Sequence, residues 1–221
     1  MRDELRRFLM EYQFAVDEML TKVAILRDEF VYLHRHNPIE HVNSRVKSVD
    51  SLLNKAARRQ LPVDLPSIRE GITDIAGIRI TCAFTSDAYR VLDSLTSQRD
   101  VQVLTIKDYI ANPKPNGYRS LHAVVSVPVF LSTGPVDVTV ELQLRTVAMD
   151  FWASAEHKIF YKFAGRVPAG LVDELAEAAA IAADLDRRME ELHIEVHGTT
   201  GPDDPDLEID DAVLGYFLNN R

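Results

Sequence analysis

Four side chains suited to binding phosphate follow one another near residue 50. Lys47, Ser51, Lys55 and Arg58 are separated by four, four and three residues. On a helix they would lie close to one line about 16 Å long, at about 1.5 Å per residue. A lysine acts as a point charge on phosphate oxygens, an arginine can bind two of them, and a serine hydroxyl donates between them. The row predicts a polyphosphate site, and the alternative is a basic helix face that only keeps the protein in solution.

Two carboxylates, Asp74 and Glu141, are candidates for binding a metal ion. Asp74 comes directly before one predicted strand, and Glu141 lies inside a later one. Carboxylates from different elements, near phosphate-binding bases, suit one or two Mg²⁺ ions that bridge phosphate oxygens and neutralise developing charge. The alternative is that each carboxylate forms an ion pair, with Arg79 or Arg145 as its partner.

One face of the predicted sheet carries a dense set of polar side chains. Period-two alternation places Arg79, His122, Glu141, Gln143 and Arg145 opposite an apolar face. Each of these residues alone is compatible with a solvated surface. Together they predict a site, because the strands that supply them are separated in the sequence and come together only in the fold.

The turn before the third predicted strand presents an aromatic ring. Asn116 and Gly117 allow a tight reversal, and Tyr118 follows them directly. A ring in this place can stack on a nucleotide base. The alternative is that Tyr118 only covers the edge of the sheet.

These groups must be positioned by a sheet with helices at both ends. Alternation predicts the strands, and apolar residues at intervals of three and four predict amphipathic helices. Short connections favour an α+β fold with a mixed sheet of four to five strands over a doubly wound one. The predicted helices cover residues 5–33, 38–59, 86–97, 146–163, 169–192 and 207–218, and the predicted strands cover residues 75–84, 101–110, 121–127 and 136–145.

The helix over residues 169–192 has a continuous heptad seam of apolar residues. Two interpretations are equally supported: the seam packs against the first helix of the same chain, or it is shared between subunits. The seam consists of Leu171, Leu175, Ala178, Ala182, Leu185, Met189 and Leu192.

The net charge of −9 is concentrated toward the C-terminus. Residues 171–211 contain 14 acidic and two basic side chains, whereas residues 45–59 contain five basic and one acidic. The acidic tail argues against a nucleic-acid partner, and the small basic cluster suits a compact anion.

No apolar run suits a membrane helix, and the N-terminus does not read as a secretory signal. With Cys82 as the single cysteine, we expect a cytoplasmic protein without internal disulfides.

Five blocks, in their order and spacing, resemble the synthetase domain of the RelA/SpoT homologue family. They are RVKSVDSLLNK, DIAGIRI, KDYIANPKPNGYRSLH, VELQLRT and AMDFWASAEHKIFYK. The length and the long end helices look like the small alarmone synthetase branch, whose fold is similar to polymerase-β-type nucleotidyltransferases. The resemblance divides the chain into an N-terminal helical segment for oligomerisation (1–40), a synthetase domain (41–165) and C-terminal helices with an acidic tail (166–221). The sequence carries no His-Asp pair of the kind found in the family's hydrolase domain.

The resemblance implies a (p)ppGpp synthetase, which transfers the β,γ-pyrophosphoryl group of ATP to the ribose 3′-OH of GTP or GDP and releases AMP. Arg45 and Arg79 would hold the adenine ring between them. Asp74 and Glu141 would bind Mg²⁺, with Glu141 as the candidate base for the 3′-OH. The ATP phosphates would be bound by Lys47, Ser51, Lys55 and Arg58.

The acceptor nucleotide would be bound by a second group of residues on the same resemblance. Tyr118 would stack on guanine, while Lys114, His122 and Gln143 would contact the acceptor's phosphates or ribose. Asp150 stands where some relatives have asparagine, and its carboxylate can still accept hydrogen bonds from guanine N1 and N2. This difference bears on which acceptor is preferred rather than on activity.

Two other functions stay open at this point. One is a toxin-type relative that pyrophosphorylates the 3′ end of tRNA or adenine nucleotides, and the acidic tail argues against the RNA acceptor. The other is a catalytically silent nucleotide-binding regulator, which the presence of both Asp74 and Glu141 argues against. The resemblance also implies a homotetramer held by residues 5–33 and 171–192, with an alarmone as an allosteric ligand between subunits.

Overall fold

A five-stranded mixed sheet forms the centre of the molecule in the computed structural model, which describes residues 2–34, 36–162 and 168–198. The strand order is β1-β2-β5-β4-β3, and β2 and β5 run parallel while the other neighbours are antiparallel. The α+β prediction is therefore confirmed. The strands are β1 (Ile39–Val46), β2 (Ala76–Cys82), β3 (Gln102–Asp108), β4 (Leu121–Leu131) and β5 (Gly134–Thr146).

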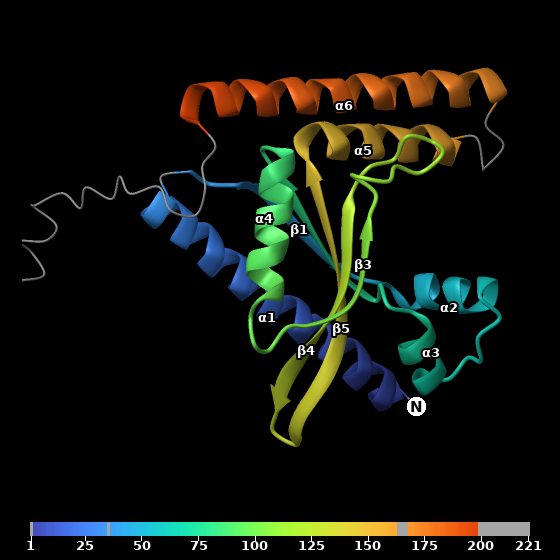
Figure 1. Cartoon of the computed structure of the whole chain (residues 1–221). Coiled ribbons are helices and arrows are strands. Elements are labelled where there is room, and N and C mark those ends of the chain that lie inside the picture. The colour runs from blue at the N-terminus through green and yellow to red at the C-terminus, as the bar shows by residue number, and fades with distance from the viewer. Residues whose placement is uncertain (1, 35, 163–167, 199–221) are drawn as a thin grey trace, which may run out of the picture.

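Two helices cover the apolar face of the sheet, α1 (Arg2–His34) and α4 (Thr85–Thr96) (Figure 1). The predicted apolar stripe of α1 lies in the core together with the inward-facing residues of β2, β4 and β5. Burial of these side chains is the main stabilising contribution to the fold. The opposite face of the sheet carries the polar side chains of the candidate site.

Two further helices stack at one end of the sheet, α5 (Val147–Lys162) and α6 (Ala169–His197) (Figure 1). The helix α6 packs against α5 and α4. The heptad seam of α6 is divided: Leu175 is buried, whereas Leu185, Met189 and Leu192 are about half exposed. The seam therefore lies along the border between the packed and the exposed sides of α6.

The predicted helix over residues 38–59 is wrong in its first half. Residues 39–46 form the edge strand β1, and the helix α2 (Val49–Arg58) begins only after Ser48, whose side chain accepts a hydrogen bond from the Ser51 amide. Val42 and Val46 account for the error, because a spacing of four fits both a helical stripe and one face of a strand. β-branched residues at those positions favour the strand.

A short helix, α3 (Leu65–Gly71), was not predicted because Pro66 reads as a helix breaker. Proline is tolerated in the first helical turn, and Asp64 caps α3 by accepting a hydrogen bond from the Ser67 amide.

The predicted helix over 207–218 lies outside the described residues. Within the part of the chain that is described, every helix is too short or too polar to cross a membrane.

Candidate active site

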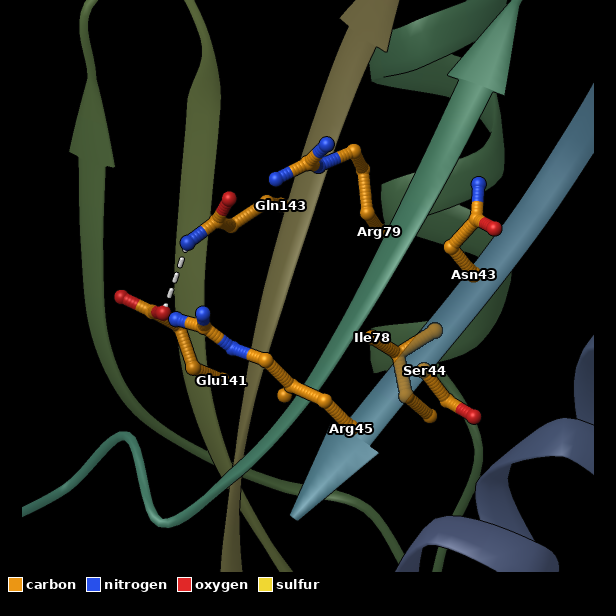
Figure 2. A pocket seen from close by; sticks show the side chains of 8 residues that line it. Asn43, Ser44, Arg45, Ile78, Arg79, Glu141 and Gln143 are labelled. Carbon is orange, nitrogen blue, oxygen red and sulfur yellow. Dashed lines mark hydrogen bonds between the residues drawn. The ribbon is translucent and has the colours of Figure 1, made fainter. Parts of the chain in front are cut away.

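A pocket of about 290 Å³ opens on the polar face, over three neighbouring strands (Figure 2). Strand register places Gly77 between Arg45 on β1 and Glu141 on β5, and Arg79 beside Gln143 in the next row. Because Gly77 has no side chain, the row from Arg45 to Glu141 is open at its middle. The pocket is lined by Asn43, Ser44, Arg45, Gly77, Ile78, Arg79, Glu141 and Gln143.

Asp74, directly before β2, is bound by two lysines from other elements. Lys55 of α2 donates to its Oδ2 atom at 2.6 Å, and Lys47 donates to the same atom at 2.9 Å. Burial alone would raise the pKa of Asp74, but the hydrogen bonds and charges of Lys55 and Lys47 outweigh it and lower the pKa to about 2. Asp74 is therefore ionised at neutral pH and holds two ammonium groups at one point.

The row of phosphate-binding residues is arranged differently from the prediction. Lys47 does not lie on the helix, because it follows β1 and precedes the Ser48 cap. Lys47 and Lys55 meet at Asp74, whereas Ser51 and Arg58 are exposed on α2. Ser51 accepts a hydrogen bond from the Ser48 hydroxyl at 2.9 Å. The structure thus brings two of the four residues together.

Glu141 is held by two polar neighbours. Gln143 Nε2 donates to Glu141 Oε2 at 2.7 Å, and His122 Nδ1 lies 3.4 Å from Glu141 Oε1. Burial tends to raise the pKa of Glu141, but the hydrogen bonds from His122 and Gln143 leave that pKa below its usual value. The charge of Asp74 acts in the opposite direction and tends to raise this pKa. Glu141 is ionised at neutral pH, as a metal ligand or proton acceptor must be.

Arg145 of β5 links the remaining polar groups of the site. Its guanidinium donates to the Tyr118 hydroxyl at 2.7 Å, to Asp150 at 3.0 Å and to Gln143 Oε1 at 3.3 Å. Arg79 forms a second ion pair with Asp150, at 3.3 Å. Arg145 is predicted on the polar face without a binding role, because spacing does not show that it connects Tyr118 with Asp150.

Tyr118 and Lys114 lie together in the loop before β4. The Tyr118 hydroxyl is 2.8 Å from His122 Nε2, and the Lys114 ammonium lies 4.5 Å from the centre of the Tyr118 ring. The same ammonium is 4.6 Å from the ring of Tyr109, which also packs edge-on against His122. The predicted site does not include Tyr109, although this residue lies within the block KDYIANPKPNGYRSLH.

Residues 44–166 match the model of a region found in RelA/SpoT proteins. The GTP pyrophosphokinase YwaC of Bacillus subtilis is 48% identical over 187 residues, which cover 85% of this chain and 89% of that protein. The chain belongs to the RelA/SpoT family.

Solved structures of a RelA/SpoT relative share the fold of this chain. Small alarmone synthetase 1 from Bacillus subtilis, in a crystal structure with its product pppGpp, has a TM-score of 0.80 at 41% identity, covering 88% of this chain and 98% of the other. The crystal structure of that synthetase with AMPCPP has a TM-score of 0.74 at 38% identity, with the same coverage of both chains. The predicted synthetase fold is therefore confirmed.

The RelA/SpoT site has features that fit a divalent cation. Asp74 Oδ1 is buried, and none of the described residues forms a hydrogen bond with it. The described residues contain no group of three or more His, Cys, Asp or Glu side chains that could hold a metal. Mg²⁺ does not need such a group, because it commonly binds through one or two carboxylates together with substrate phosphates and water. Asp74 and Glu141 supply that donor set.

The contacts of Asp74 with Lys47 and Lys55 lead us to expect that the stability of the fold depends on pH. The pKa of Asp74 falls from an ordinary 3.8 to about 2 on folding, so ionised Asp74 stabilises the fold by an amount on the order of 2 kcal/mol. This contribution is complete above about pH 4 and is lost as the pH falls through 2. We expect the gap in unfolding free energy between wild type and Asp74→Asn to shrink from pH 4 to pH 2, measured by urea unfolding.

A matched control is Asp137→Asn, because Asp137 is exposed on β5. The difference in unfolding free energy between Asp137→Asn and wild type should stay constant from pH 4 to pH 2. A constant gap for Asp74→Asn as well would contradict the proposed strength of the Lys47 and Lys55 contacts.

Proposed function

We propose that this RelA/SpoT family member is a (p)ppGpp synthetase, which transfers the β,γ-pyrophosphoryl group of ATP to the 3′-OH of GTP or GDP. The observation that carries the proposal is the position of Glu141, which lines the basic pocket and lies 3.4 Å from His122, the residue that contacts Tyr118 in the loop before β4. The chain also matches most of the length of YwaC, a protein named as a GTP pyrophosphokinase.

The donor nucleotide occupies the pocket between β1 and β5. Arg45 and Arg79 both line it, and their planar guanidinium groups suit the two faces of an adenine ring. Lys47 and Lys55 hold the phosphates: each ammonium carries three protons, so each can bind Asp74 and still donate to a phosphate oxygen. Ser51 and Arg58, exposed on α2, extend the same basic surface. The AMPCPP complex of small alarmone synthetase 1 supports a donor of this class.

Asp74 and Glu141 are the residues that would hold Mg²⁺. When bound, the ion would neutralise charge on the phosphate oxygens of the donor. The buried Oδ1 of Asp74 and the ionised Glu141 are the groups of this chain that suit it.

The acceptor binds on the other side of Glu141. Tyr118 stacks on guanine, and Lys114 beside it supplies a positive charge for the acceptor phosphates. His122 contacts both Tyr118 and Glu141, so it joins the base-binding ring to the candidate proton acceptor. Gln143 and Asp150 are fixed by Arg145 and provide hydrogen-bonding groups for the acceptor's ribose and base.

Transfer requires one bond to form and one to break. The acceptor 3′-oxygen attacks the β-phosphorus of ATP, and the bond from that phosphorus to the oxygen bridging the α- and β-phosphates breaks, so AMP leaves with that oxygen. Glu141 accepts the proton of the 3′-OH. The protein contributes chiefly position and charge stabilisation, which is the usual basis of phosphoryl-type transfer.

Incubation with γ-labelled ATP tests the proposed acceptor. Separate reactions contain GDP, GTP, an adenine nucleotide or bulk tRNA, and the labelled products are separated by chromatography. We expect label in pppGpp and ppGpp. Label confined to tRNA or to adenine nucleotides would favour a toxin-type activity, and nucleotide binding without any transfer would favour a silent regulator.

We propose further that the protein acts in the cytoplasm as a homotetramer. The support for a cytoplasmic protein is a single cysteine, Cys82, which is buried and free. The support for an oligomer is the exposed apolar stripe of α6, formed by Leu185, Met189 and Leu192. Exposed stripes of this kind mark association surfaces, and closed symmetry is the usual way to bury them.

Substitution of Leu185 tests this assembly. Leu185 is 52% exposed, so Leu185→Glu should split the oligomer without disturbing the core of the chain, and sedimentation should show a smaller species. Ala180→Glu is the matched control, because Ala180 is exposed on the same helix outside the apolar stripe. A monomeric wild type, or an unchanged assembly in Leu185→Glu, would contradict the proposal.

A further inference from the structure

The loop before β4 that carries Lys114, Gly117 and Tyr118, called the acceptor loop from here on, packs directly on the helix α6. Gly117 has a φ of +85°, and a Cβ atom added to it would overlap the Cβ of Ala179. The next nearest atoms are the Ala176 carbonyl oxygen and Cα, at 3.8 and 3.9 Å, which are ordinary contact distances. A side chain at position 117 would therefore collide with Ala179, so only glycine fits against alanine here.

The same loop is hydrogen-bonded to α5, and α5 is hydrogen-bonded to α6. Asn116 Nδ2 donates to Glu156 Oε1 at 3.2 Å, and the Trp152 indole donates to the Leu175 carbonyl oxygen at 2.9 Å. Trp152 and Ala179 belong to a small buried cluster against which Tyr118 packs. The loop, α5 and α6 thus form one packed unit.

The contact with α6 lies inside the turn that carries the acceptor-binding groups. The Gly117 amide donates to the Lys114 carbonyl at 2.8 Å, and the Lys114 amide donates to the Tyr118 carbonyl at 3.1 Å. A displacement of Gly117 must therefore move Lys114 and Tyr118 with it. Of the two donor-binding lysines, Lys55 lies on α2 and Lys47 meets it at Asp74, and α2 lies away from α6 (Figure 1).

We propose that α6 positions the acceptor loop through the contact between Gly117 and Ala179, and so sets the affinity for the acceptor nucleotide independently of ATP. Gly117 and Ala179 are positioning residues that act through Tyr118 and Lys114. The inference rests on the proposed function, in which those two residues bind the acceptor. Small residues are required at both positions because the backbone of the loop and the helix approach so closely.

The test is an exchange of the two small side chains. Gly117→Ala should raise the KM for GDP about tenfold or more, because displacements of about 1 Å at a binding group have effects of this size or larger. The KM for ATP should not change. Ala179→Gly removes the overlapping atom, so the double variant Gly117→Ala with Ala179→Gly should recover most of the affinity for GDP. The residual loss reflects the positive φ of Gly117.

Two controls separate positioning from a loss of helix stability. Ala180→Gly introduces the same glycine one residue along α6, at an exposed position, and should leave both KM values unchanged. Ala179→Leu should weaken GDP binding, while Ala180→Leu should not. Titration calorimetry with GDP alone provides the same comparison without catalysis.

Each result is decisive. A double variant no better than Gly117→Ala, or equal rises in the KM for ATP and GDP, would overturn the positioning role. If the wild type binds no guanine nucleotide in calorimetry, the proposed function fails instead. Recovery of GDP affinity in the double variant supports both the positioning role of Gly117 and Ala179 and the proposed function.

Discussion

We expect Glu141→Gln and Asp74→Asn each to lower the rate of pyrophosphoryl transfer by at least about a hundredfold. Glu141 is the candidate proton acceptor, and both carboxylates are the candidate metal ligands. Each substitution keeps the shape of the side chain while removing its negative charge. The measurement is the steady-state rate of AMP release at saturating ATP and GDP.

Both variants should fold normally. An amide oxygen at position 74 can still accept from Lys47 and Lys55, and an amide at position 141 can still pair with Gln143. Asp137→Asn removes a carboxylate from the exposed side of the same strand β5, and its rate should match that of wild type. Circular dichroism and thermal unfolding check that the variants retain their structure.

A second measurement separates metal binding from proton transfer. Raising the Mg²⁺ concentration should recover part of the activity of a variant that has only lost affinity for the ion, whereas loss of a proton acceptor is not recovered. Activity within about tenfold of wild type in both variants would contradict the roles assigned to Asp74 and Glu141.

The strands that build the site could be predicted from the sequence because their alternation is nearly unbroken. On β5 the residues from Val138 to Leu144 alternate between the buried face and the polar face. A register of this kind assigns each side chain to a face without any knowledge of its neighbours. Alternation alone therefore places Glu141, Gln143 and Arg79 on one face, and all three line the same pocket.

The arrangement of the phosphate-binding residues could not be predicted in the same way. The spacing of Val42 and Val46 fits both a helix and a strand, so the prediction places Lys47 on a helix that begins only after it. Spacing along the chain also does not reveal that Lys47 and Lys55 meet at Asp74. That contact depends on how α2 is placed relative to the turn before β2, which is a tertiary property.

The contacts of the acceptor-binding residues could likewise be predicted only in part from the sequence. The turn around Gly117 and the ring of Tyr118 were recognisable from local residue types. The position of Tyr109 beside Lys114 depends on how the loop folds back on itself, and the contact of the loop with α6 joins residues far apart in the sequence. Pairings of this kind become visible only when the elements are packed together.

We expect Tyr118→Ala to weaken the binding of GDP by about five- to 150-fold while leaving ATP binding unchanged, because loss of a stacked ring costs about 1 to 3 kcal/mol. The Lys114 ammonium already lies against the Tyr118 ring. Stacking guanine on that face would have to displace the ammonium, which places the expected loss in the lower part of this range. Titration calorimetry with each nucleotide measures both affinities directly.

The variant Tyr118→Phe separates the two contributions of this residue. Phenylalanine keeps the ring for stacking but loses the hydroxyl that contacts His122 and Arg145. If stacking is the main contribution, Tyr118→Phe should retain most of the affinity for GDP. Its turnover should still fall, because His122 also lies against Glu141 and loses a partner that fixes its ring. Equal losses for ATP and GDP in Tyr118→Ala would instead show that Tyr118 supports the packing of the loop on α5 and α6 rather than the acceptor base.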